Sequence, residues 1–164
     1  VANRFHNVFG ETFILPNEHL QEESKLITGT DGEKMSKSKN NIINIFASEN
    51  ELKKQIKSIE TDSKELESPK EWRTCNLYNI YKLIADENQI DTMKSKYEAG
   101  GYGYGHAKND LFQLIVEKYS EERKKFNHYI SNPNEVEEIL IKGAEKASIT
   151  ADKVLSRVRK KLGY

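Results

Sequence analysis

The chain has 164 residues, of which 36% are hydrophobic, so it can bury one ordinary core or a small domain plus part of another. Its 26 basic residues balance its 26 acidic residues, which excludes a whole-chain field that would draw it to nucleic acid or to a membrane. The single cysteine, Cys75, excludes an internal disulfide framework, and the four scattered histidines give no indication of a zinc site. We expect a cytoplasmic protein, because a chain with a single cysteine suits a reducing compartment. No stretch of the sequence is apolar enough to span a bilayer.

The first 44 residues are typical of a mixed α/β segment. Residues 1–9 carry apolar side chains at helical spacing, and the short apolar run at 25–28 predicts a strand. Residues 31–44 are polar and show no periodicity, which predicts a loop. Because the chain starts without methionine, inside what looks like a helix, we expect it to be a fragment.

Helices are predicted along the rest of the chain. Ser48 begins one helix with a capping box, and a second contains Leu77 and Ile80. We expect Asp91 to cap a short third helix. It ends where the glycine-rich stretch 100–105 forms a tight interhelical connection.

Two long helices are predicted after that connection. The first covers residues 108–130, and the second begins at Pro133, with Asn132 and Glu135 forming its capping box. Small residues at four-residue steps (Gly143, Ala147 and Ala151) predict close packing of the last helix against the 108–130 helix. Since no alternation of period two follows residue 44, the fold is predicted to be mainly α.

The loop Asp31–Ser38 carries the strongest chemical indication. Two residues separate Lys34 from Lys37, and the hydroxyls of Ser36 and Ser38 flank Lys37. Ammonium groups can neutralise charge that develops on a leaving pyrophosphate, and hydroxyls and loop amides can donate hydrogen bonds to it. For two lysines alone, a solvated lysine-rich loop is the ordinary explanation. The exact order Lys-Met-Ser-Lys-Ser is what makes the pattern specific.

This string, preceded by Thr28-Gly29-Thr30-Asp31-Gly32, resembles the second signature of class I aminoacyl-tRNA synthetases. Further strings narrow the resemblance to tryptophanyl-tRNA synthetases of the bacterial type: Arg4-Phe5-His6-Asn7, Gly10-Glu11-x-Phe13, Thr61-Asp62-Ser63, Cys75-Asn76-Leu77, Gly100-Gly101-Tyr102-Gly103 and Lys142-Gly143-Ala144. The resemblance implies the tail end of a Rossmann-like α/β catalytic domain in residues 1–44. A helical domain that binds the tRNA anticodon would follow in residues 45–164.

The implied activity is that of a tryptophan–tRNA ligase, which activates L-tryptophan with ATP to the adenylate and transfers it to tRNA(Trp). Lys34 and Lys37 would be catalytic. The ATP site would comprise Leu26, Lys34, Met35, Ser36, Lys37 and Ser38. Mg²⁺ would arrive with ATP, with no metal site on the protein. Arg157 and Arg159 would contact tRNA, although cations there equally suit the helix dipole.

The chain departs from the family in one respect, since it holds no His-x-Gly-His element and no βαβ pattern. We therefore expect it to be inactive alone, with its loop disordered, and the full-length protein to be a homodimer. Two alternatives stay open: a fragment of a tyrosyl-tRNA synthetase, and a stand-alone helical module that binds tRNA.

Overall fold

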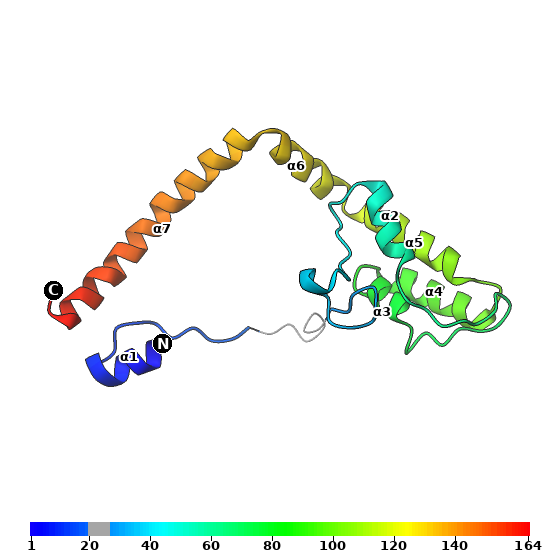
Figure 1. Ribbon diagram of the computed structural model, residues 1–164, viewed down its shortest axis with the longest axis horizontal. Coiled ribbons are helices and arrows are strands. Elements are labelled where there is room, and N and C mark those ends of the chain that lie inside the picture. Colours follow the sequence, from blue (N-terminus) through cyan, green and yellow to red (C-terminus); the bar gives the residue numbers. More distant parts are fainter. Residues whose placement is uncertain (20–26) are drawn as a thin grey trace. The chain divides into compact units, whose positions relative to one another are not determined.

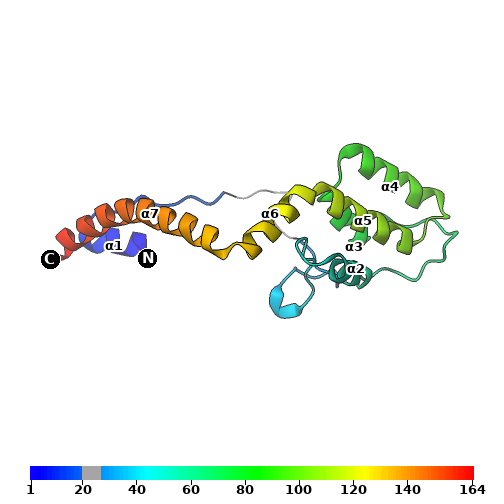
Figure 2. The same cartoon turned by 90° about the horizontal axis from the view of Figure 1, so that it is seen from above.

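The computed structural model describes residues 1–19 and 27–164. The chain forms two compact units, one made of Val1–Leu20 with Asn127–Tyr164 and the other of Gln21–Phe126. Its helices are α1 (Ala2–Phe9), α2 (Glu49–Lys57), α3 (Asn76–Lys82), α4 (Glu87–Ala99), α5 (Tyr104–Lys118), α6 (Ser120–Ser131) and α7 (Pro133–Leu162), with a 3-10 turn, η2, at Lys37–Lys39 (Figures 1 and 2).

The predicted mainly α fold is confirmed. In the part of the chain that the structure describes, the one isolated β-bridge pairs Thr28 with Lys34. No helix in that part is both long and apolar enough to cross a membrane. The boundary predicted between residues 44 and 45 remains a prediction.

The core of the unit Gln21–Phe126 is built by the apolar faces of α2 to α5. Leu52 on α2, Leu77 on α3 and Leu111 on α5 are fully buried, and Met93 and Tyr97 on α4 join them. Each such side chain contributes about 1.5–3 kcal/mol through burial. The helical periodicity of the sequence thus becomes a packed set of helices in this unit.

The connection between α2 and α3 wraps around one buried lysine. Lys70 is 4% exposed, and its Nζ donates to the carbonyl oxygens of Glu65 (2.7 Å), Leu66 (3.1 Å) and Ser68 (2.7 Å). The same connection runs so close to Gly100 that a Cβ there would lie 2.3 Å from the Glu67 carbonyl oxygen. Residues 100–103 therefore form a tight interhelical connection, as predicted, whereas Tyr104 and Gly105 already belong to α5.

Helix α4 starts earlier than predicted, and Asp86 caps it in place of Asp91. The Asp86 carboxylate accepts from the Gln89 amide (2.8 Å), and the Gln89 side chain accepts from the Asp86 amide (3.0 Å). These reciprocal bonds form a capping box, which satisfies backbone donors at the helix start. Asp91 is an exposed residue within the helix.

Replacing Asp86 by Ala should lower the free energy of unfolding by about 1 kcal/mol, because α4 loses its N-cap. Trp72 is the sole tryptophan and bonds through its Nε1 to Glu98 of α4 (2.9 Å), so its fluorescence during urea unfolding reports on this helix. Asp91→Ala is the matched control and should change the free energy of unfolding by less than about 0.5 kcal/mol. An equal loss in both variants would contradict the assignment of the cap.

The single helix predicted for residues 108–130 is wrong, because α5 ends at Lys118 and α6 begins at Ser120. Tyr119 interrupts the helical backbone with φ −103° and ψ 20°. One turn later, the Arg123 guanidinium donates to the carbonyl oxygens of Ile45 and of Ala47. Ile45 and Ala47 precede α2, so long-range hydrogen bonds lie next to the break between α5 and α6.

Helix α7 begins at Pro133, as predicted, but its predicted capping box is wrong. The Asn132 side chain donates from Nδ2 back to the His128 carbonyl oxygen (2.7 Å), and Glu135 Oε2 lies 2.7 Å from His128 Nε2. The small residues Gly143, Ala147 and Ala151 are exposed on α7, and their packing against the 108–130 helix stays a prediction. At α2, by contrast, Ser48 accepts from the Glu51 amide as predicted.

Candidate functional site

Residues 27–41, here called the lysine loop, fold back on themselves as a tight hairpin. The Gly29 amide donates to the Glu33 carbonyl oxygen (2.7 Å), and the Met35 amide donates to that of Ile27 (2.9 Å). Gly32 makes the reversal with φ 76°, a left-handed conformation that suits glycine. The backbone on both sides of Lys34 is therefore fixed by hydrogen bonds.

The buried side chain of Asn41 closes the lysine loop from inside. Its Oδ1 accepts from the Ser36 amide (2.8 Å), and its Nδ2 donates to Asp31 Oδ1 (2.7 Å) and to the Lys34 carbonyl oxygen (3.2 Å). A Cβ on Gly29 would lie 2.4 Å from Asn41 Cγ, so the loop closes this tightly only with glycine there. Asn41 is 2% exposed, and its bonding is what makes that burial favourable.

The loop presents its lysines and hydroxyls to solvent. Lys34 and Lys37 are exposed, and the Ser36 and Ser38 hydroxyls lie 2.8 Å apart. The turn η2 carries Lys37 and ends at Asn40, whose φ is 55°. The expected disorder of this loop is wrong, because hydrogen bonds within the chain hold it. Leu26, the remaining predicted ATP contact, lies outside the residues that the structure describes, and Met35 is half-buried.

Asp31 supplies a fixed negative charge at the turn of the loop. The hydrogen bond from Asn41 lowers the pKa of Asp31, and the Glu33 amide (3.0 Å) adds to this effect. The carboxylate therefore stays ionised near neutral pH. Glu33 also lies 3.9 Å from Lys39, a loose surface pair, which leaves Lys34 and Lys37 as the exposed ammonium groups of the signature.

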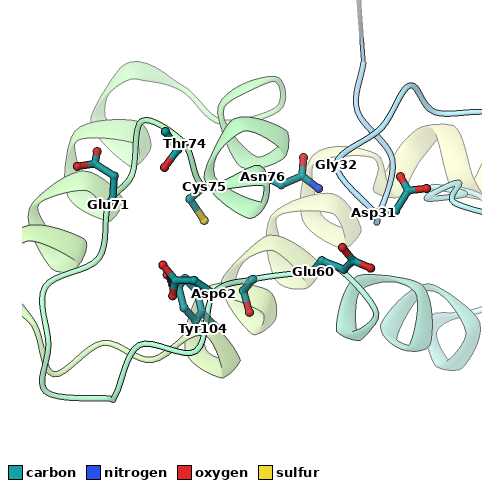
Figure 3. A pocket seen from close by; sticks show the side chains of 10 residues that line it. Asp31, Gly32, Glu60, Asp62, Glu71, Thr74, Cys75, Asn76 and Tyr104 are labelled. Atoms are coloured by element: carbon teal, nitrogen blue, oxygen red, sulfur yellow. Dashed lines mark hydrogen bonds between the residues drawn. The ribbon is translucent and has the colours of Figure 1, made fainter.

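The base of the loop is joined to two helical segments. Asn76, the first residue of α3, donates from Nδ2 to the Gly29 carbonyl oxygen (2.8 Å) and accepts from the Thr28 hydroxyl (2.6 Å). The Glu60 amide, just beyond α2, donates to the Thr30 carbonyl oxygen (2.7 Å). A cavity of about 340 Å³ opens beside these contacts, lined mostly by polar side chains (Figure 3).

The Thr61-Asp62-Ser63 string forms a turn on the far wall of this cavity. Asp62 Oδ1 accepts from the Lys64 amide (3.1 Å) and from the Tyr104 hydroxyl (2.7 Å). Burial raises the pKa of Asp62, but these two hydrogen bonds outweigh it, so the pKa lies below its usual value. The Tyr104 contact fixes the turn to the start of α5.

The two arginines predicted to contact tRNA do not share one site. Arg157 lines a surface cavity of about 610 Å³ in its unit, together with Glu11, Thr12, Phe13, Ile14, Lys160 and Lys161. Arg159 does not line it, because residues two apart on a helix point to different sides. The helical spacing groups Arg157 with Lys160 and Lys161 instead.

Sequence reasoning missed the residues that shape the loop, chiefly Asn41 and Asn76. The Asn40-Asn41 pair was visible as part of a polar segment, and Asn76 stood in a string that the resemblance had matched. Neither pattern indicates a hydrogen bond to a particular backbone group. Within residues 1–19 and 27–164, no group of His, Cys, Asp or Glu side chains is arranged to hold a metal ion.

Comparisons with known proteins identify relatives of this chain. The family model described as tRNA synthetases class I (W and Y) matches residues 1–120. The tryptophan–tRNA ligase of Campylobacter jejuni (strain RM1221) is 44% identical over 163 residues, which are 99% of this chain and 51% of that protein. The ligase of Rhodopirellula baltica is 38% identical over the same shares of the two chains.

Solved structures give the same result. The crystal structure of tryptophanyl-tRNA synthetase from Campylobacter jejuni complexed with ADP and tryptophan has a TM-score of 0.87 and 44% identity, and the match covers 99% of this chain and 51% of that one. A second crystal structure of the enzyme from this organism has a TM-score of 0.86. The chain spans about half the length of the relatives it matches.

The chain therefore belongs to the class I tRNA synthetases for tryptophan and tyrosine. Within that family, these relatives place it with the tryptophanyl-tRNA synthetases, which confirms the resemblance drawn from its motifs.

Proposed function

We propose that this chain is the C-terminal half of a tryptophan–tRNA ligase, which activates L-tryptophan with ATP and transfers the tryptophanyl group to tRNA(Trp). The observation that carries the proposal is the lysine loop, which holds Lys34, Ser36, Lys37 and Ser38 on an ordered backbone in a chain 44% identical to a named tryptophan–tRNA ligase. Amino-acid activation releases pyrophosphate, and such a loop suits the charge that develops on it.

Each group in the loop has a distinct chemical task in this proposal. Lys34 and Lys37 neutralise the phosphate charges, with Lys37 acting on the departing pyrophosphate. The Ser36 and Ser38 hydroxyls, which lie 2.8 Å apart, donate hydrogen bonds to phosphate oxygens. Met35 and Leu26 complete the ATP contacts. Mg²⁺ comes with ATP and supplies further charge on the phosphates.

In the same proposal, the helical part of the chain binds tRNA. Arg157 and Arg159 contact the phosphate backbone, which makes binding depend on salt. Because they hold no His-x-Gly-His element and no βαβ pattern, the 164 residues are inactive by themselves. The full-length protein works as a homodimer in the cytoplasm.

The decisive experiment is pyrophosphate exchange into ATP, measured with the full-length protein and with this chain. The full-length protein should exchange in the presence of tryptophan, and this chain should not. Exchange driven by tyrosine in place of tryptophan would favour the tyrosyl enzyme. A full-length protein that binds tRNA but shows no exchange with either amino acid would favour the stand-alone module and overturn the proposal.

A further inference from the structure

Asn76 joins the lysine loop to the helical part of its unit. Its side chain amide donates to the Gly29 carbonyl oxygen (2.8 Å) and accepts from the Thr28 hydroxyl (2.6 Å). Both partners belong to the base of the loop, whereas Asn76 begins α3, whose next residue, Leu77, is fully buried. One side chain thus connects a buried core helix to an exposed loop.

The contact lies beside open space. The cavity of about 340 Å³ is lined by Asn76 from α3 and by Asp31 and Gly32 from the turn of the loop (Figure 3). Atoms across such a gap gain no packing energy from one another. The position of the loop base beside this cavity therefore depends on the hydrogen bonds of Asn76 to Thr28 and Gly29, together with the bond from the Glu60 amide to the Thr30 carbonyl oxygen.

A short chain of bonds leads from Asn76 to the first lysine of the signature. Asn76 holds the carbonyl group of Gly29, and the Gly29 amide donates to the carbonyl oxygen of Glu33 (2.7 Å). Lys34 follows directly and pairs with Thr28 in the β-bridge. A displacement of the Asn76 side chain therefore displaces the backbone that carries Lys34.

We propose that Asn76 is a positioning residue, which sets the place of the lysine loop relative to α3 by holding Thr28 and Gly29. It acts through these residues and does not touch the nucleotide. Groups that stabilise a transition state must be held within about 0.5 Å of their productive positions, so a loosened base lowers the rate before it lowers stability. This inference rests on the proposed function for its effect on catalysis, but not for its effect on the loop.

The first test measures amide hydrogen exchange in this chain, which needs no activity. In Asn76→Ala, the amides of Gly29 and Met35 should exchange about tenfold faster, because the base of the loop opens more often. The amides of Leu111 and Ile115 in α5 should keep their rates. Equal acceleration in α5 would show a general loss of stability, and unchanged loop rates would show that Asn76 does not hold the loop. Either result overturns the proposal.

Matched variants separate the effect of the tether, meaning the hydrogen bonds of Asn76 to Thr28 and Gly29, from other effects of mutation. Thr28→Val removes the hydroxyl that donates to Asn76 with little change in shape, so it should accelerate loop exchange by a smaller factor. Asn79→Ala alters the same residue type one turn along α3 and should leave the loop unchanged. If Asn79→Ala has the same effect as Asn76→Ala, the tether is refuted.

The second test measures pyrophosphate exchange in the full-length protein. Asn76→Ala should lower kcat about tenfold and leave KM for tryptophan unchanged, because the amino-acid pocket lies elsewhere. Faster loop exchange combined with an unchanged kcat would overturn the positioning role. An unmodified full-length protein without exchange activity would refute the proposed function instead, while the amide rates still decide whether Asn76 holds the loop.

Discussion

Lys70→Met should lower the free energy of unfolding of the unit Gln21–Phe126 by about 3 kcal/mol, a large share of the stability of an ordinary domain. Lys70 is buried, and its ammonium group donates to the carbonyl oxygens of Glu65, Leu66 and Ser68. Methionine keeps the length and the apolar stem but removes every donor. Part of the loss is recovered where water reaches the freed carbonyl groups, since Glu65 and Leu66 are exposed.

The measurement is urea unfolding followed by the fluorescence of Trp72, the sole tryptophan, which lies two residues from Lys70. The urea concentration at the midpoint of unfolding should fall, while the slope of the free energy of unfolding against urea concentration stays the same. Lys64→Met is the matched control, because Lys64 is an exposed lysine of the same connection, and it should change stability by less than about 0.5 kcal/mol. Similar losses in the two variants would mean that loss of positive charge, and not the carbonyl contacts of Lys70, determines the result.

Sequence patterns predicted the helices of the core well where local rules decide. The apolar spacing in α3 and α5 and the capping serine of α2 all describe interactions between near neighbours in the chain. The same rules could have predicted Asp86 as the cap of α4, since Gln89 stands three residues later, as a capping box requires.

The break at Tyr119 could not be predicted in this way. No proline or glycine marks it, and the apolar spacing continues from α5 into α6. What accompanies the break is a set of contacts from Arg123 to carbonyl groups 76 and 78 residues earlier. Contacts over such separations depend on the whole fold, so local periodicity carries no information about them.

The candidate site divides along the same line. Its lysines and serines were found because a short exact string identifies them, whereas Asn41 and Asn76 were missed because their roles depend on geometry. Asn76 meets Gly29 across 47 residues of sequence. The expectation of a disordered loop was wrong for this reason, since it assumed that an absent half must hold a loop that Asn41 and Asn76 already hold.

Lys37→Ala in the full-length protein should lower kcat for tryptophan-dependent pyrophosphate exchange by a factor of about 10² to 10³, as removal of one preorganised group at a developing charge typically does. KM for tryptophan should change little, because the proposed function assigns the loop to the phosphates of ATP. Lys37 begins η2, between the hydroxyls of Ser36 and Ser38, so the backbone that carries it is already in place before ATP binds.

Lys39→Ala is the control for this experiment, because it removes the same charge two residues further along the same turn. Lys39 is exposed and lies 3.9 Å from Glu33, a pair too loose to fix the loop, so its loss should change kcat by less than about threefold. If kcat falls equally in both variants, the loop contributes only its summed charge, and the particular role of Lys37 is refuted. If kcat falls only in Lys37→Ala, the order of residues in the signature determines the chemistry. The alternation of lysine and serine places an ammonium group between two hydroxyl groups, on a backbone that Asn41 holds closed.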